Sequence, residues 1–304
     1  MTAREAGIAP ALPVGWRRHV EPAWLEGWQP ETVALQGGST DVIVMGEGPP
    51  LLLLPPLPGY KEAWIGVAWR LARSHRVVTF DQRAPLAGHE PWSAQLDDLE
   101  RVAEAFAPGP AIVVGHSLGG ALAQRWALLR PERVRALVLS SSFARVGITR
   151  GQWRKRYVEQ SLVLMAQRIL PERLAAPLAR RLARRGAWVY DASCDERLLA
   201  FIRFCIRRQS IAVAAARVRQ AFAHDTRGRL GEIRCPTLIL VGERETAWAR
   251  AASVELGRLI PNAEQRVSPE AAHLHPLSRP AWLAETVTEW LRTVSCARAA
   301  LVTP

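Results

Sequence analysis

The stretch that decides the fold is AIVVGHSLGGALAQRWALL, residues 111–129. It opens with four apolar residues in a row, which predicts a strand buried on both faces. A turn follows, Gly115-His116-Ser117-Leu118-Gly119-Gly120, and then a helical pattern. A lone Gly-x-Ser-x-Gly motif is weak, but the order of strand, sharp turn and helix makes it specific. The small neighbours let the chain bend at Ser117, whose hydroxyl then lies above free N–H groups of the helix. From the residues alone, a helix-capping serine in a Gly-rich turn is the alternative.

Strands and helices alternate on both sides of this turn. The sequence predicts strands at residues 31–35, 41–45, 51–54, 77–80, 111–114, 136–139 and 237–241 and near Gln265. Helices are predicted at residues 96–106, 121–129, 247–259 and 281–293. Such alternation predicts a mostly parallel sheet that is flanked by helices on both faces.

The segment from Val146 to Gly228 interrupts this alternation. It has no strand pattern, and its apolar residues recur at helical spacing. We therefore predict an N-terminal lead at residues 1–30, a core at residues 31–145 and 229–304, and an inserted helical cap at residues 146–228.

The chain resembles the α/β-hydrolase superfamily, in particular its cap-bearing, esterase-like members. The six residues Gly115 to Gly120 match that family's nucleophile elbow, and the resemblance covers roughly residues 33–291. The family orders nucleophile, acid and histidine along the chain. The resemblance implies that Ser117 is the nucleophile and that His273, in Ala271-Ala272-His273-Leu274-His275-Pro276, is the catalytic base. We expect His275 to be a polar loop residue.

The acid of the expected triad departs from the family pattern. After the strand at residues 237–241 the family usually has Gly-x-x-Asp, whereas this chain has Gly242-Glu243-Arg244-Glu245. Glu245 takes the aspartate position and is the predicted acid. A glutamate can also orient a histidine, but it is one methylene longer. Glu243 is the alternative acid, and a further alternative is that both glutamates are solvated loop residues.

The loop expected to stabilise the oxyanion also departs from the family. Pro55-Pro56-Leu57-Pro58-Gly59 replaces the usual His-Gly, and proline has no N–H to donate. The predicted donors are the backbone N–H groups of Leu57 and Leu118. Asp81-Gln82-Arg83 resembles the family's Asp-x-Arg, which we expect to be structural.

Composition narrows the class of protein. The 304 residues are 49% hydrophobic and 22% charged, which is typical of a globular domain with its own core. The four cysteines (Cys194, Cys205, Cys235 and Cys296) form no C-x-x-C pair, which favours reduced thiols and a cytoplasmic location. Without a signal-peptide pattern or an apolar run long enough to cross a bilayer, we expect no transmembrane segment. No nucleotide-binding or metal-binding motif occurs, so we expect no cofactor and no metal.

The charge is concentrated in the predicted cap. Residues 146–228 hold 17 of the 40 basic side chains and six of the 28 acidic ones, and thus +11 of the net +12. All but two of the basic residues are arginines, a bias that a GC-rich genome also produces. If the charge has a function, it faces an anionic partner: an acyl carrier protein, an acidic substrate or an anionic lipid surface. The strongest candidates are Arg180, Arg181, Arg184 and Arg185, followed by Arg207 and Arg208. Nucleic acid is not expected, because no nucleic-acid motif accompanies the charge.

These observations predict a serine hydrolase that cleaves a carboxylic ester, thioester or lactone through an acyl-enzyme on Ser117. An acyltransferase or thioesterase acting on a carrier-bound acyl group remains open, as does hydrolysis of a carbon–carbon bond. A ligand-binding homologue without turnover is the alternative from a different class.

Overall fold

A computed structural model describes residues 14–85, 90–147, 162, 165–184 and 194–300 of the chain. Its centre is an eight-stranded sheet in the order β1-β2-β4-β3-β5-β6-β7-β8. The strands are β1 (Pro30–Leu35), β2 (Gly38–Met45), β3 (Pro50–Leu54), β4 (Arg76–Phe80), β5 (Ala111–His116), β6 (Val134–Ser140), β7 (Thr237–Gly242) and β8 (Ala263–Ser268).

The sheet is mostly parallel, as the alternation of strands and helices predicts. β2 pairs antiparallel with both β1 and β4, and every pairing from β4 across to β8 is parallel. The carboxyl ends of β3, β5, β6, β7 and β8 therefore meet at one edge. In open α/β sheets this edge is where ligands bind.

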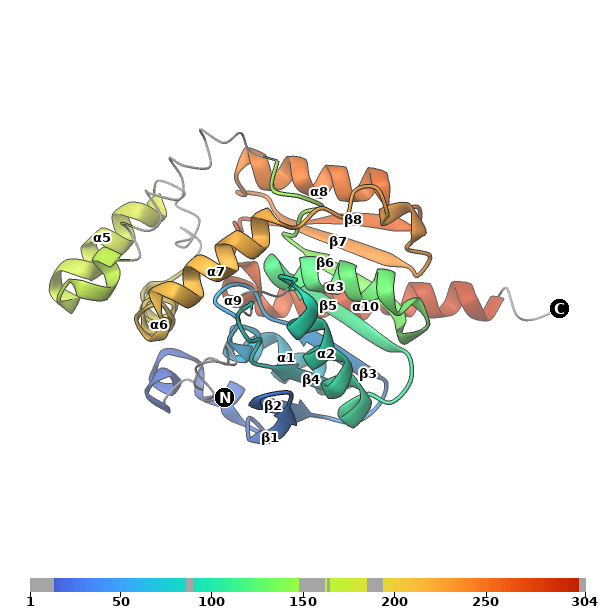
Figure 1. Ribbon diagram of the computed structural model, residues 1–304, viewed down its shortest axis with the longest axis horizontal. Coiled ribbons are helices and arrows are strands. Elements are labelled where there is room, and N and C mark those ends of the chain that lie inside the picture. The colour runs from blue at the N-terminus through green and yellow to red at the C-terminus, as the bar shows by residue number, and fades with distance from the viewer. Residues whose placement is uncertain (1–13, 86–89, 148–161, 163–164, 185–193, 301–304) are drawn as a thin grey trace.

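Two apolar layers cover the sheet. Ile112 and Val114 of β5 face one layer, which includes residues of α1 (Ile65–Leu71) and α10 (Pro280–Ala300). Val113 faces the other, with residues of α2 (Ser93–Phe106), α3 (Leu118–Leu129) and α8 (Ala247–Leu259). In Figure 1, α3 lies in front of the strands and α10 behind them. This two-sided burial explains why the central strands read as continuous apolar runs.

Three α-helices described between β6 and β7 fall within the predicted cap, residues 146–228. They are α5 (Glu172–Arg184), α6 (Glu196–Arg208) and α7 (Ile211–Phe222), and α5 stands farthest from the sheet in Figure 1. Asp195 caps α6 by accepting from the Leu198 N–H at 2.8 Å, and Ser210 caps α7 in the same way. An isolated bridge between Arg145 and Asp225 joins the two ends of the insertion.

The described part of the predicted N-terminal lead, residues 14–30, packs against α6. It forms two short 3-10 helices, η1 (Val14–His19) and η2 (Pro22–Leu25). Trp16 of η1 is buried edge-on against Phe201 of α6, with ring centroids 6.3 Å apart. Two further short helices, η3 (Lys61–Trp64) and α9 (His275–Ser278), follow the carboxyl ends of β3 and β8. The described core also includes η4 (Pro131–Arg133) and η5 (Leu230–Glu232).

Asp81-Gln82-Arg83 follows β4 and is buried. Arg83 forms an ion pair with Asp98 of α2 and donates from Nη1 to the Gln36 carbonyl at 2.9 Å. The segment thus ties α2 to the edge of the sheet.

Candidate active site

Ser117 sits on a strained turn between β5 and α3. Its backbone angles are φ 51° and ψ −115°, a conformation that an L-residue adopts at a cost. The turn has no room for larger neighbours. A Cβ added at Gly115 would lie 2.4 Å from the Gly119 carbonyl oxygen, and one at Gly119 would lie 2.1 Å from that of Leu54. Close packing of the two glycines holds the strained serine in place.

Three of the predicted site residues meet at the carboxyl edge of the sheet. Ser117 Oγ lies 3.1 Å from His273 Nε2, and His273 Nδ1 lies 3.0 Å from Glu245 Oε1. Glu245 comes from the loop after β7, and His273 from the loop after β8. Because a carboxylate only accepts hydrogen bonds, the His273 Nδ1–H donates to Glu245, which leaves Nε2 to accept from the serine hydroxyl.

The carboxylate of Glu245 is buried but stays ionised. Burial alone would raise the pKa of Glu245, but the charge and hydrogen bond of His273, together with a hydrogen bond from Ser141, outweigh burial and lower it. Glu243 lies apart from this arrangement. It is exposed, and its Oε2 accepts the Glu270 N–H at 2.8 Å. Of the two rival glutamates, only Glu245 is hydrogen-bonded to His273 in the part of the chain that the structure describes.

A run of three serines at the end of β6 lies beside these residues, and the sequence analysis did not identify it. Ser140 Oγ lies 2.7 Å from His275 Nε2 and 2.9 Å from His116 Nδ1. Ser141 Oγ lies 3.3 Å from the same His275 nitrogen, and Ser142 donates to the Ser117 carbonyl at 3.0 Å. The only signal in the sequence is Ser140-Ser141-Ser142 itself, directly after a buried strand.

The structure corrects the expectation for His275. The expected polar loop residue is the first residue of α9 and is fully buried, against the serine run. The ring of His116 lies 5.6 Å from that of His275 and 5.1 Å from that of His273. Burial, reinforced by the nearby His273 and His275, holds the pKa of His116 well below 6.5, so His116 is neutral.

The loop with the predicted oxyanion donor packs directly on the elbow. Gly119 approaches the Leu54 and Pro55 carbonyls closely, and the loop turns back through a hydrogen bond from the Gly59 N–H to the Pro56 carbonyl at 2.6 Å. Leu118 is the first residue of α3, so its N–H has no acceptor within that helix. Leu57 and Leu118 therefore lie on two segments in contact with each other.

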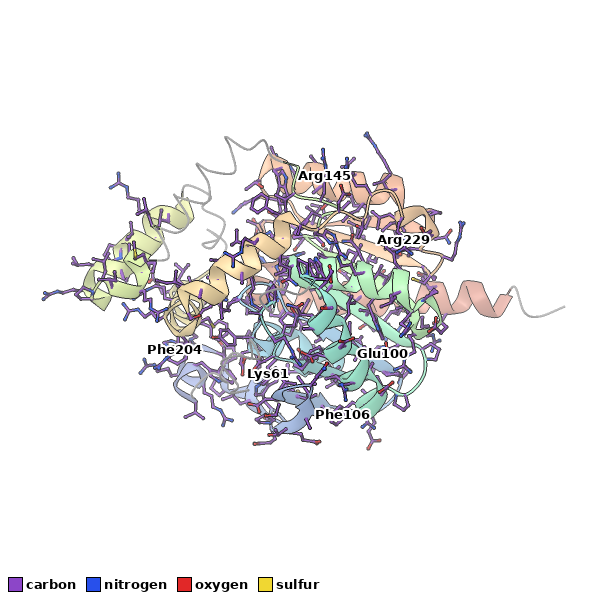
Figure 2. The ribbon with its side chains drawn as sticks, viewed as in Figure 1. Lys61, Glu100, Phe106, Arg145, Phe204 and Arg229 are labelled. Atoms are coloured by element: carbon purple, nitrogen blue, oxygen red, sulfur yellow. The ribbon has the colours of Figure 1, made fainter. Side chains whose placement is uncertain are left out.

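A compact group of buried charges follows this loop in the chain, around Lys61, which is labelled in Figure 2. Lys61 Nζ contacts Asp81 at 2.8 Å and Glu62 at 3.1 Å, and the Lys61 backbone N–H donates to the other Asp81 oxygen at 2.8 Å. All three side chains are at most 6% exposed. Burial lowers the pKa of Lys61, but Asp81 and Glu62 outweigh it and raise the pKa overall. Lys61 is thus charged.

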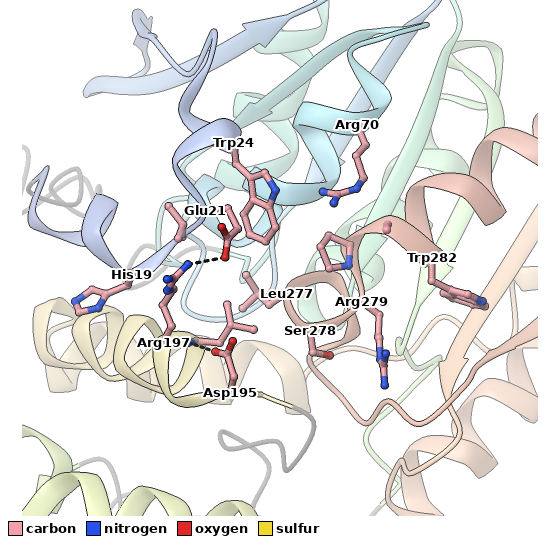
Figure 3. A pocket seen from close by; sticks show the side chains of 14 residues that line it. His19, Glu21, Trp24, Arg70, Asp195, Arg197, Leu277, Ser278, Arg279 and Trp282 are labelled. Atoms are coloured by element: carbon pink, nitrogen blue, oxygen red, sulfur yellow. Dashed lines mark hydrogen bonds and ion pairs between the residues drawn. The ribbon is translucent and has the colours of Figure 1, made fainter.

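A cavity of about 410 Å³ lies elsewhere, where η2, α6, α9 and the start of α10 meet (Figure 3). Trp24, Leu277 and Trp282 line it, and an ion pair between Arg197 of α6 and Glu21, just before η2, spans 2.5 Å beside it. Ser117, His273 and Glu245 do not line this cavity. Among the described residues no group of three or more His, Cys, Asp or Glu side chains could hold a metal ion. Within those residues, no helix is long and apolar enough to cross a membrane.

The fold and this geometry are those of an α/β hydrolase, and comparison with known proteins agrees. Residues 49–280 match the model of the alpha/beta hydrolase fold family, so the chain belongs to that family.

Several relatives carry names that describe their activity. The chain is 29% identical, over 80% of its length and 95% of the relative's, to a pimeloyl-[acyl-carrier protein] methyl ester esterase of Nitrosomonas europaea. It is 25% identical to a thermophilic esterase from Thermogutta terrifontis, with a TM-score of 0.67 over 88% of this chain and 99% of that one. An enol-lactonase from Burkholderia xenovorans has the same fold, with a TM-score of 0.70 at 22% identity over 86% of this chain and 100% of that one.

Glu62, which is buried beside Lys61, provides a test of the electrostatics of this cluster of charges. Burial and the Asp81 charge raise the pKa of Glu62 from 4.5 to about 7, against the pull of Lys61. The folded state therefore holds this proton more tightly than the unfolded state, so the contribution of Glu62 to stability is favourable below pH 4.5 and is lost as the pH rises through 7. We expect Glu62→Gln to gain about 3 kcal/mol relative to the wild type between pH 4.5 and pH 8 in urea unfolding.

The exposed Glu26→Gln is the matched control and should show no such trend. If the Glu62→Gln difference is flat across this range, the assignment of a protonatable carboxyl at this position is wrong.

Proposed function

We propose that this α/β-hydrolase cleaves carboxylic esters through an acyl-enzyme on Ser117. The observation that carries the proposal is the continuous hydrogen-bonded chain from Ser117 through His273 to Glu245, at 3.1 and 3.0 Å, on a strained elbow. Thioesters and lactones have the same reacting carbonyl and are the next substrates to test. The names of the esterase and lactonase relatives support this choice of chemistry.

Each step follows from the arrangement of the site. His273 takes the Ser117 proton as the serine oxygen attacks the carbonyl, and Glu245 stabilises the resulting imidazolium. The N–H groups of Leu57 and Leu118 hold the oxyanion. His273 then protonates the leaving alcohol, and in the second half it activates the water that releases the acid. The lowered pKa of Glu245 suits this role, because the acid must remain ionised throughout.

A second candidate is attack on a carrier-bound acyl group. The relative from Nitrosomonas europaea is named for a substrate on an acyl carrier protein, and the insertion of this chain carries most of the net positive charge. Arg180 and Arg181 of α5 are exposed, and Arg180 contacts Glu196 of α6 at 3.2 Å. The side chains of Arg184 and Arg185 lie outside the described residues. Arg207 of α6 instead donates to the Gln167 and Leu170 carbonyls, at 3.0 and 2.6 Å, and so joins α6 to that segment.

The nucleophile is tested with a fluorophosphonate probe and a chain-length series of nitrophenyl esters. We expect covalent labelling at Ser117, located by peptide mass spectrometry. Ser117→Ala should abolish labelling and lower kcat by about 10⁶, the scale seen when a triad nucleophile is lost. Undiminished ester turnover by that variant would disprove the proposed mechanism.

The acid is tested by a matched pair of substitutions on one loop. Glu245→Gln should lower kcat by roughly 10³ to 10⁴, because an amide cannot stabilise the imidazolium and favours the wrong tautomer. Glu243→Gln makes the same chemical change two residues away and should have little effect. If the ranking were reversed, Glu243 would be the acid instead.

The carrier-bound candidate is tested at the cap surface. The double variant Arg180→Gln/Arg181→Gln should slow the reaction of a carrier-bound ester more than that of a small neutral ester. The difference should be largest at low salt and should vanish near 1 M, where the Debye length is about 3 Å. Equal rates for wild type and variant on the carrier-bound ester at every salt concentration would show that these arginines are only a solvated surface.

A further inference from the structure

Arg217 is a cap residue that reaches the oxyanion loop. It lies on α7, is fully buried, and donates from Nη2 to the Gln82 carbonyl. Its guanidinium rests against Gly59, two residues after Leu57. A Cβ added at Gly59 would come within 2.4 to 2.8 Å of three guanidinium atoms. Gln82 in turn donates its N–H to the Gly59 carbonyl at 2.9 Å.

The described residues provide no carboxylate that pairs with Arg217 alone. Burial lowers the pKa of Arg217 to about 10, so the guanidinium is charged at neutral pH. The groups that oppose this effect are Tyr60 and Asp81. Both oxygens of Asp81 already accept hydrogen bonds from Lys61, at 2.8 Å each. Within the described residues, Arg217 Nε and Nη1 have no hydrogen-bond partner.

Two neighbouring side chains share this property. The Gln82 amide nitrogen and the Tyr60 hydroxyl are buried without a partner among the described residues, and the two residues are 4% and 2% exposed. Tyr60 follows Gly59 directly, and Gln82 is the residue whose carbonyl Arg217 holds. A buried guanidinium with unused N–H groups costs several kcal/mol unless an anion meets it. Unused donors are thus found on Arg217, on Gln82, whose carbonyl Arg217 holds, and on Tyr60, which directly follows Gly59.

We propose that Arg217, with Gln82 Nε2 and the Tyr60 hydroxyl, binds a free carboxylate on the acyl part of the substrate. The preferred substrates are then half-esters of dicarboxylic acids, in which one carboxyl is esterified and the other is ionised. This inference rests on the proposed function and names its substrate class. A carboxylate suits the site because a guanidinium offers several N–H donors in one plane, matched to two carboxylate oxygens. In the free protein the Arg217 guanidinium packs against Gly59, and the substrate carboxylate would pair with it beside this loop.

The experiment compares two nitrophenyl esters of equal length, mono-4-nitrophenyl adipate and its terminal amide, in the full-length protein. Wild type should prefer the carboxylate over the amide in kcat/KM. Arg217→Gln should reduce this preference by about 10- to 100-fold, the range expected for hydrogen bonds to a charged group. Arg217→Lys should retain part of it. The preference should persist at 0.5 M salt, because a buried pair is screened little.

Arg219→Gln is the matched control, since it removes the same charge from an exposed position of the same helix. An equal loss of kcat/KM on both esters would show that Arg217 only holds α7 in place, and it would overturn the proposal. If Arg217→Gln does not fold, the substrate preference and inhibition of the wild type decide the question. Absence of a carboxylate preference with half-esters of C5 to C8 diacids, and equal inhibition by the diacids and their monoamides, would overturn it as well.

Failure of the proposed function has a different signature. Labelling of Ser117 and turnover of the neutral amide ester do not depend on carboxylate recognition. If both are absent, the hydrolase mechanism fails and this proposal fails with it. If both are present without a carboxylate preference, only the substrate class is wrong.

Discussion

The strained backbone of Ser117 is the constraint on which the rest of the site depends. A positive φ at a residue with a side chain persists only where its surroundings leave no alternative. Here the restraint is the close contact of Gly115 with Gly119, and of Gly119 with the end of β3. The same contact places the loop after β3 against the first turn of α3. One packing requirement thus fixes Ser117 on the turn and brings the two predicted oxyanion donors onto touching segments.

The side chain of Glu245, one methylene longer than aspartate, is accommodated by the neighbouring strand rather than by the turn at Ser117. Glu245 follows β7, and its neighbour in the sheet, β6, ends in the serine run. Ser141 hydrogen-bonds to Glu245 and lies 3.3 Å from the buried His275. The backbone of Ser141 also has a positive φ, of 43°, so this supporting residue is held in an uncommon conformation too. The position of Glu245 therefore depends on contacts from both sides of β7.

The sequence was sufficient for the fold and for the turn at Ser117, because these rest on local pattern. Apolar runs define the parallel strands, and the glycines around Ser117 define the turn. The choice between Glu243 and Glu245 needed the structure, because both follow the same strand. The Glu243 N–H still donates to the Ser268 carbonyl beyond the end of β7, whereas Glu245 lies in the turn that closes onto the Gly242 carbonyl. The contacts of His275 and Arg217 could not be predicted from local pattern, because their partners lie more than 130 residues away in the chain.

The arginine bias of the chain has two physical parts. On the exposed face of α5, any cation would keep the surface solvated, and a genomic bias is enough to explain the choice. At buried and half-buried positions the guanidinium has a function that lysine lacks, because it donates in several directions within one plane. Arg83 joins Asp98 to the Gln36 carbonyl, and Arg207 joins two carbonyls of another segment. Lys61, one of the two lysines, stands where a compact ammonium fits between two carboxylates. Arg217 is also buried, but only one of its nitrogen atoms donates a hydrogen bond to the described protein. Its unused donors are the observation that points toward a substrate.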